Sequence, residues 1–318
     1  MIEILTSRGF KILLALIIAA VLLITPQSLR NFGLYQLSMW LTISLAALGL
    51  NLTLGYAGQV SMAQGAFVGI GAYTTGLLTL AGVPWPVAFL ASGLLCFAIG
   101  WVLGYPALRV QHHYLAFVTL AFSTLVFLLM RNEEWLTKGI YGLTDVPRPV
   151  FFEFSTGKSL PFYYFVLAVV SVMSLAIWWL IRSPWGRAFV ALRENPVRAL
   201  SLGGFAGALY APLVQFFEPN SFALPLSLNL LLMVIVGGSG TFFGPFIGAA
   251  TFVLMSEWLR DIVREYYLIM YAIVVMILML FCPTGIMGLG DRFIAHFRQK
   301  RISAERAEKA RDLSQQEI

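Results

Sequence analysis

Long apolar runs separated by short polar patches form the main pattern along this chain. An apolar run of about 20 residues is long enough for an α-helix to cross the hydrocarbon core of a bilayer. Several of the runs here are shorter than that, and Gly or Pro interrupts them, which is typical of broken helices. The pattern predicts an all-α, polytopic transmembrane helical bundle with some short or broken helices. The expected segments are Ile12–Ile24, Phe32–Leu54, Val60–Ala81, Pro86–Tyr105, Tyr114–Met130, Pro161–Ile181, Phe205–Phe217, Ala223–Val236, Phe246–Trp258 and Tyr266–Phe281.

The boundaries of this bundle follow from the same pattern. Residues 1–290 form the expected transmembrane domain, with about eight to ten membrane segments. Residues 291–318 form a polar tail. At the start, Arg8 and Lys11 precede an apolar run, as they do in a secretory signal. No small-x-small cleavage pattern follows, so we interpret the run as a retained first span and keep a signal peptide as the alternative.

Composition supports a membrane protein and argues against several other classes. Hydrophobic residues make up 59% of the chain and charged residues 11%, whereas soluble domains carry about 25% charged residues. The net charge of +6 belongs mostly to loop and tail segments, so we expect no nucleic-acid partner. Cys96 and Cys282 sit in apolar segments without metal-ligand spacing, and the three histidines form no cluster. We therefore expect no catalytic residue, metal or cofactor in this chain, and no enzyme activity.

The basic residues predict the orientation of the bundle. Residues 183–201 carry several arginines and one acid, and the tail is also rich in Lys and Arg. Residues 131–158 balance four basic residues against four acids. Because short cytoplasmic loops carry an excess of Lys and Arg, we place residues 183–201 and the C-terminus in the cytoplasm. Residues 131–158 then lie on the outer side.

Glycines recur four residues apart in several apolar segments, including Gly65 with Gly69, and Gly240 with Gly244 and Gly248. This spacing lets helix backbones approach closely in lipid. We interpret it as tight packing of the bundle.

A polar stretch interrupts the apolar surroundings at residues 51–66. Asn51, Gln59 and Gln64 carry amides that cannot face lipid without partners, because each unpaired amide costs several kcal/mol. Gly55 and Gly58 are expected to break the helix. We interpret these five residues as the lining of a polar path. An interfacial turn, with the amides bonded between helices, remains the alternative.

A second motif occupies residues 183–203, on the expected cytoplasmic side. Ser183 and Pro184 fit a helix start, and Asn195-Pro196 repeats that signal, so two short amphipathic helices are expected. Arg187 and Glu194 share one face of the first helix. Such a pair of helices could fit a groove on a partner protein. An ordinary basic loop in contact with lipid headgroups is the alternative.

Five stretches of the sequence together carry a family resemblance. The stretches are LGLNLTLGYAGQVSMAQGAFVGIGAYTTGLL, HYLAFVTLAF, SPWGRAFVALRENPVRALSLG, FAGALYAP and LLMVIVGGSGTFFGPFIGA. Over about residues 32–290 the chain resembles the inner-membrane permeases of branched-chain amino acid ABC importers, the LivM type.

The resemblance implies a bacterial inner-membrane subunit, embedded in the lipid bilayer, of a larger importer. Its implied partners are a second permease, two cytoplasmic ATPases that bind the ATP, and a periplasmic solute-binding protein. It also implies that residues 183–203 are the coupling loop seated in the ATPase. The positions carried over to this loop are Arg193, Glu194, Asn195 and Gly203.

The chain departs from the family pattern at one place. Family members have a longer connection where Gly203 meets Gly204 here, and between half a span and one whole span of about 20 residues is absent. Either a real deletion or an omitted stretch explains the difference. Two alternatives for function also stay open: a permease of the same family for urea, short amides or other small solutes, and a stand-alone channel or secondary transporter.

Overall fold

The fold is described by a computed structural model of residues 1–318. It describes residues 20–107, 112–151, 154–183, 196–262, 266, 269–270, 273, 276–277, 280 and 285–288. The polar tail 291–318, most of the first expected segment and much of Tyr266–Phe281 lie outside the described residues.

Helices dominate the described part of the chain, which confirms the all-α prediction. The long helices are α3 (Asn31–Asn51), α4 (Gln64–Leu80), α5 (Trp85–Ala107), α6 (His112–Asn132), α8 (Ser159–Arg182), α10 (Pro196–Val214), α11 (Leu224–Gly237) and α12 (Gly244–Ile262). Short elements connect them: η1 (Leu52–Tyr56), α7 (Glu134–Thr137), η2 (Gly139–Tyr141), β1 (Val150–Phe151), β2 (Phe154–Ser155) and η3 (Pro219–Phe222). The two strands form one small antiparallel ribbon.

Five of the helical segments in the described residues are long and apolar enough to cross a membrane. They are Asn31–Tyr56, Trp85–Gly104, Leu115–Asn132, Ser159–Arg182 and Pro219–Gly237. Two shorter apolar helices cover Leu200–Val214 and Gly244–Ser256. The expected mixture of full-length and short segments is therefore confirmed, and the protein is a multi-pass membrane protein.

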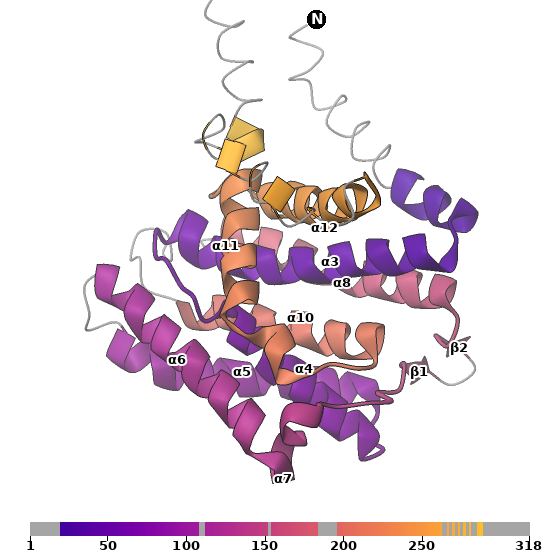
Figure 1. Ribbon diagram of the computed structural model, residues 1–318, viewed down its shortest axis with the longest axis horizontal. Helices are drawn as coiled ribbons and strands as arrows, with labels where there is room; N and C mark the ends of the chain where they lie inside the picture. The colour runs from indigo at the N-terminus through magenta and orange to yellow at the C-terminus, as the bar shows by residue number, and fades with distance from the viewer. Residues whose placement is uncertain are drawn as a thin grey trace, which may run out of the picture.

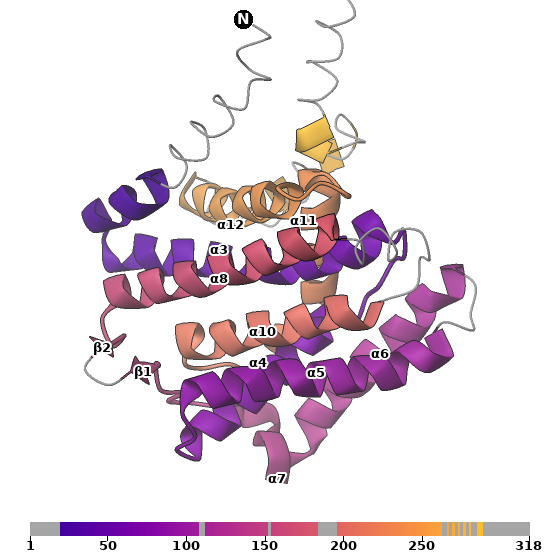
Figure 2. The same cartoon turned by 180° about the vertical axis from the view of Figure 1, so that it is seen from behind.

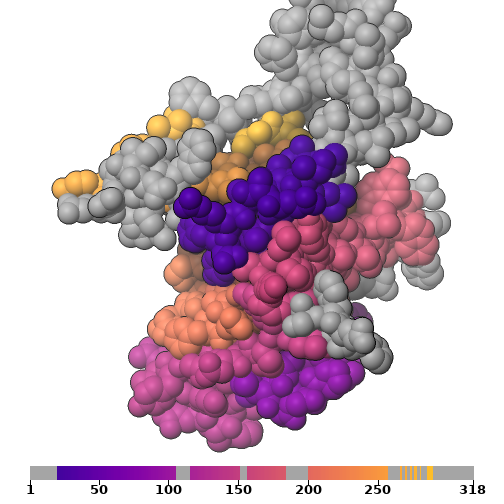
Figure 3. Space-filling model, turned by 90° about the vertical axis from the view of Figure 1, so that its right-hand side faces the viewer, coloured from indigo at the N-terminus to yellow at the C-terminus, as the bar shows by residue number. Residues whose placement is uncertain are grey.

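The helices α3, α8, α10 and α12 run roughly alongside one another, and α11 runs across them (Figure 1). The ribbon β1–β2 precedes α8 at one end of the bundle. Figure 2 shows that the C-terminal ends of α3 and α8 and the N-terminal end of α10 lie at the opposite end. On the face shown in Figure 3, α8 packs beside the N-terminal part of the chain, where Tyr163 and Tyr164 donate hydrogen bonds to the carbonyls of Leu22 and Leu23.

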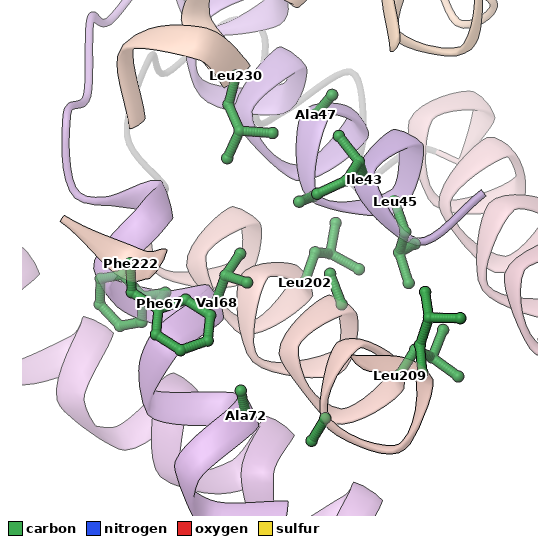
Figure 4. Close-up of a cluster of buried hydrophobic side chains, with 14 of the residues drawn as sticks. Ile43, Leu45, Ala47, Phe67, Val68, Ala72, Leu202, Leu209, Phe222 and Leu230 are labelled. Atoms are coloured by element: carbon green, nitrogen blue, oxygen red, sulfur yellow. The ribbon is translucent and has the colours of Figure 1, made fainter. Parts of the chain in front are cut away.

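Helix α10 is the centre of the packing and contacts α3, α4 and α5. Small residues allow this: a Cβ on Gly71 would overlap the backbone of Gly204, so the α4 and α10 backbones are in direct contact. Figure 4 shows the buried apolar side chains of α3, α4 and α10 gathered between these helices, among them Leu45, Val68 and Leu209.

The course of α10 corrects one detail of the sequence analysis. We expected a short helix beginning at Pro196 and a separate apolar segment beginning at Phe205. The structure has one continuous helix, Pro196–Val214, through the Gly203–Gly204 peptide. Leu200 and Leu202 are already buried, so the apolar face of the expected short helix continues directly into the bundle.

Candidate functional site

The polar stretch after α3 is a true helix break, as expected from Gly55 and Gly58. α3 passes into the π-helical turn η1, in which the Ala57 N–H donates to the Leu52 carbonyl at 3.2 Å. Gly58 then adopts φ +68°, a conformation that favours glycine. The chain stays non-helical until α4 begins at Gln64. Single π-helical turns of this kind are frequent at functional sites.

A second break separates α11 from α12. Gly238 and Gly240 have φ values of +119° and +79°, and α12 begins at Gly244. Thr241 holds the loop in shape, because its hydroxyl donates to the Gly238 carbonyl at 2.7 Å and accepts from the Gly244 N–H at 3.2 Å. The separate apolar segments Ala223–Val236 and Phe246–Trp258 predicted this interruption, whereas Gly240 and Gly244 were interpreted only as packing positions. The run Gly237-Gly238-Ser239-Gly240 is the local sequence signal of the break.

The two breaks meet at Asn51, the last residue of α3. Its Nδ2 donates to the Thr241 carbonyl at 2.8 Å, and its Oδ1 accepts from the Gly240 N–H at 2.9 Å. Asn51 is 0% exposed. Gly55 lies against the same loop, and a Cβ there would overlap the Gly240 nitrogen and the Asn51 Oδ1. The amide of Asn51 is therefore engaged by backbone groups on both sides.

The N-terminus of α4 lies inside the bundle and is satisfied by side chains of other helices. The Gly65 N–H donates to the Ser227 hydroxyl of α11 at 2.9 Å. Just before the helix, the Met62 N–H donates to the Thr119 hydroxyl of α6 at 3.1 Å. A buried helix start needs such partners because its first N–H groups have none within the helix. Nothing in the local sequence pointed to Ser227 or Thr119, which are separated from these amides by 162 and 57 residues.

Gln64 is the first residue of α4 and is fully buried. Its Nε2 donates to the Ala46 carbonyl of α3 at 3.0 Å, while its Oε1 has no hydrogen-bond partner among the described residues. Gln59 lies on the other side of the break and lines a cavity of about 10 Å³ with Thr53, Ser61 and Thr119, and the surface exposed to this cavity is apolar. Gly58, at the tip of the break, is exposed.

The predicted coupling residues fall into two groups. Arg187, Arg193, Glu194 and Asn195 lie outside the described residues. Gly203 is placed, within α10, where its ideal Cβ position is 2.9 Å from the Phe67 Cβ and 3.2 Å from the Gln64 Nε2. This end of the predicted loop is therefore buried against α4, next to the first break.

The described residues contain no group of three or more His, Cys, Asp or Glu side chains that could hold a metal ion. Their polar site groups are amides, hydroxyls and backbone atoms. Such groups can bind and guide a polar solute.

Comparison with known proteins identifies the family. The model of a family described as the permease component of branched-chain amino acid transport systems matches residues 33–203 and 201–282. The two matched stretches overlap at residues 201–203, next to the place where this chain departs from the family pattern by a shorter connection.

Similar curated proteins agree with this match. The high-affinity branched-chain amino acid transport system permease protein LivM of Salmonella typhimurium is 31% identical over 326 aligned positions, covering 89% of this chain and 76% of that protein. LivM of Escherichia coli strain K12 is 32% identical over 287 positions, covering 77% and 67%. The autoinducer 2 import system permease protein LsrC of Salmonella paratyphi B is 25% identical over 266 positions, covering 74% of each. No solved structure matches this chain.

The matched stretches of the family model cover both helix breaks and every long helix that carries the site. This chain therefore belongs to the family of branched-chain amino acid ABC transport permeases, whose members are transport subunits and not enzymes.

Proposed function

We propose that this chain is a permease subunit of an ATP-driven importer for branched-chain amino acids. The observation that carries the proposal is the polar helix break at residues 51–64 inside an apolar bundle, in a chain of this family. Irregular backbone at membrane depth is tolerated where protein buries it or where it lines a cavity. In the proposed importer this chain pairs with a second permease, with two cytoplasmic ATPases that bind ATP, and with a periplasmic solute-binding protein.

The path in this proposal runs along the first break. Gly58 and Gln59 face it most directly, and Asn51, Gly55 and Gln64 form the wall behind them. The support is the gathering of buried amides and hydroxyls around this break. The site holds amides and hydroxyls instead of charged groups, so a solute would bind weakly in transit. Weak binding suits an importer whose specificity resides in its delivery protein.

In this proposal, residues 183–203 on the cytoplasmic side bind the ATPase and transmit its movement to the bundle. Arg187, Arg193, Glu194 and Asn195 contact the ATPase, and Gly203 links that contact to the bundle. The support is the packing of α10, which follows these residues directly and contacts α3, α4 and α5. A shift at the start of α10 would therefore reach the helices on both sides of the first break. Access then alternates between the two sides of the membrane by a rigid-body movement.

The substrate assignment is tested by uptake of labelled leucine and labelled urea in a strain that lacks this chain and has no redundant leucine system. The proposal predicts that leucine uptake is lost, returns with a plasmid copy of the chain, and that urea uptake is unchanged. Unchanged leucine uptake with a loss of urea uptake would transfer the assignment to the alternative, a permease of the same family for other small solutes. The alternative has one observation in its favour: this chain is also similar to a permease named for the import of autoinducer 2, which is not an amino acid.

The coupling role is tested by Glu194→Ala. The proposal predicts that the variant reaches the membrane in normal amounts but co-purifies with less ATPase, because the loop loses a charged contact. Glu134→Ala, an exposed acid on the expected outer side, is the matched control and should co-purify normally. Normal ATPase recovery with Glu194→Ala would contradict the coupling role.

A further inference from the structure

Helix α11 connects the two breaks. It has 14 residues and so a length of about 21 Å. Near its start, Ser227 accepts the Gly65 N–H at the beginning of α4. Its end leads directly into the loop that Asn51 holds at Gly240 and Thr241. In both ribbon views α11 runs across the neighbouring helices (Figure 1, Figure 2).

The contact at Asn51 uses both ends of its amide. The Nδ2 donates to the Thr241 carbonyl while the Oδ1 accepts from the Gly240 N–H, and an apolar side chain of the same size can form neither bond. The contact is also tight, because a side chain on Gly55 would collide with the Gly240 nitrogen. The loop itself is already held by Thr241. Asn51 therefore joins two segments that are each ordered locally.

The position of this contact matters for transport. The C-terminal end of α3 lies at the same end of the bundle as the C-terminal end of α8 and the N-terminal end of α10 (Figure 2). These two helix ends flank residues 184–195, part of the proposed ATPase contact. If the ATPase moves residues 184–195, the ends of α8 and α10 move with them, and the Asn51 contact lies at this same end of the bundle.

We propose that Asn51 is a positioning residue for transport: its amide locks the α11–α12 break to the α3–α4 break, so that both move as one unit when the path opens. This inference rests on the proposed import function and assigns Asn51 the task of transmitting movement between the two breaks. The same amide that forms the wall of the path is held by the loop behind it, so a solute does not compete for it.

The first test compares Asn51→Leu with Ser44→Ala in the transporter purified with its partner subunits. Leu has a similar size and cannot form either hydrogen bond. Ser44 is a matched control, since it is fully buried in the same helix and its hydroxyl donates to the Trp40 carbonyl within that helix. The number of leucine molecules imported per ATP hydrolysed should fall by about tenfold for Asn51→Leu and stay at the wild-type ratio for Ser44→Ala.

A merely structural role gives a different result in the same test. The amount of Asn51→Leu transporter would then be lower, while the transporters that assemble would import leucine at the wild-type ratio per ATP. That result would overturn the inference.

The second test needs no change at Asn51 and so applies even if Asn51→Leu does not fold. Spin labels are attached to Ala57→Cys and Ser239→Cys, one in each break, in a chain whose Cys96 and Cys282 are replaced by alanine. The inference predicts the same distance distribution between the labels in the nucleotide-free and ATP-bound transporter. A shift in that distance between the two states would show that the breaks move separately and would contradict the inference.

Failure of the inference is distinguishable from failure of the proposed function. If the wild-type transporter imports leucine and the label distance changes with ATP, only the inference fails. If the wild-type transporter imports no leucine with all its partners present, the proposed function itself fails.

Discussion

Asn51 is buried at the end of α3, and its amide joins the two helix breaks. An unpaired amide in an apolar bundle costs several kcal/mol, so its sequence position alone required partners. The identity of those partners could not be predicted, because Gly240 and Thr241 are 189 and 190 residues away. The break at Gly55 and Gly58 was predictable because glycine acts locally. The contact of Gly55 with the second break was not.

A residue-scale prediction concerns Gly55→Ala. The added methyl group would overlap the Gly240 nitrogen, and backbone atoms cannot move aside cheaply. We expect a loss of about 1–3 kcal/mol of stability, as is usual for overpacking, seen as a lower midpoint of thermal unfolding in detergent. Gly33→Ala is the control, because its methyl group would meet only the flexible Leu29 side chain at 3.3 Å. Equal midpoints for the two variants would argue against the tight contact between the breaks.

The elements themselves were largely predictable because lipid imposes strong demands on them. Every long helix in the described residues corresponds to an expected apolar segment, since a membrane span needs both length and apolar side chains. The exception is the start of α10. The sequence signal at Asn195-Pro196 predicted a separate short amphipathic helix, but in the structure the residues from Pro196 onward are continuous with the apolar helix that follows. Local periodicity cannot show whether two adjacent helical segments are continuous.

An element-scale prediction concerns the buried start of α4. Ser227→Ala removes the acceptor of the Gly65 N–H, and a buried donor left without a partner costs about 1–3 kcal/mol. We expect a clear drop in the thermal unfolding midpoint. Ser123→Ala is the control, because the Ser123 hydroxyl is buried and has no partner among the described residues. A Ser227→Ala protein as stable as Ser123→Ala would mean that α11 does not support the start of α4.

At the scale of the whole molecule, the distribution of Lys and Arg predicts an orientation. The ribbon β1–β2 lies in the expected outer segment, and the C-terminal end of α8 leads to the expected cytoplasmic segment. We predict that alkaline phosphatase is active when fused after Asp145 and inactive when fused after Arg198 or Ile318, because the enzyme matures only outside the cytoplasm. The reverse pattern would invert the topology and remove residues 183–203 from the reach of any cytoplasmic ATPase.

The central claim is that this bundle moves its solute with energy supplied by partner ATPases. The most direct measurement uses vesicles that contain the purified permeases and ATPases, with binding protein and labelled leucine on the side where the solute is delivered. The account predicts that leucine accumulates only when ATP is present at the ATPases, and to a concentration above that supplied. Leucine that equilibrates across the membrane equally fast without ATP would identify a channel and contradict the account.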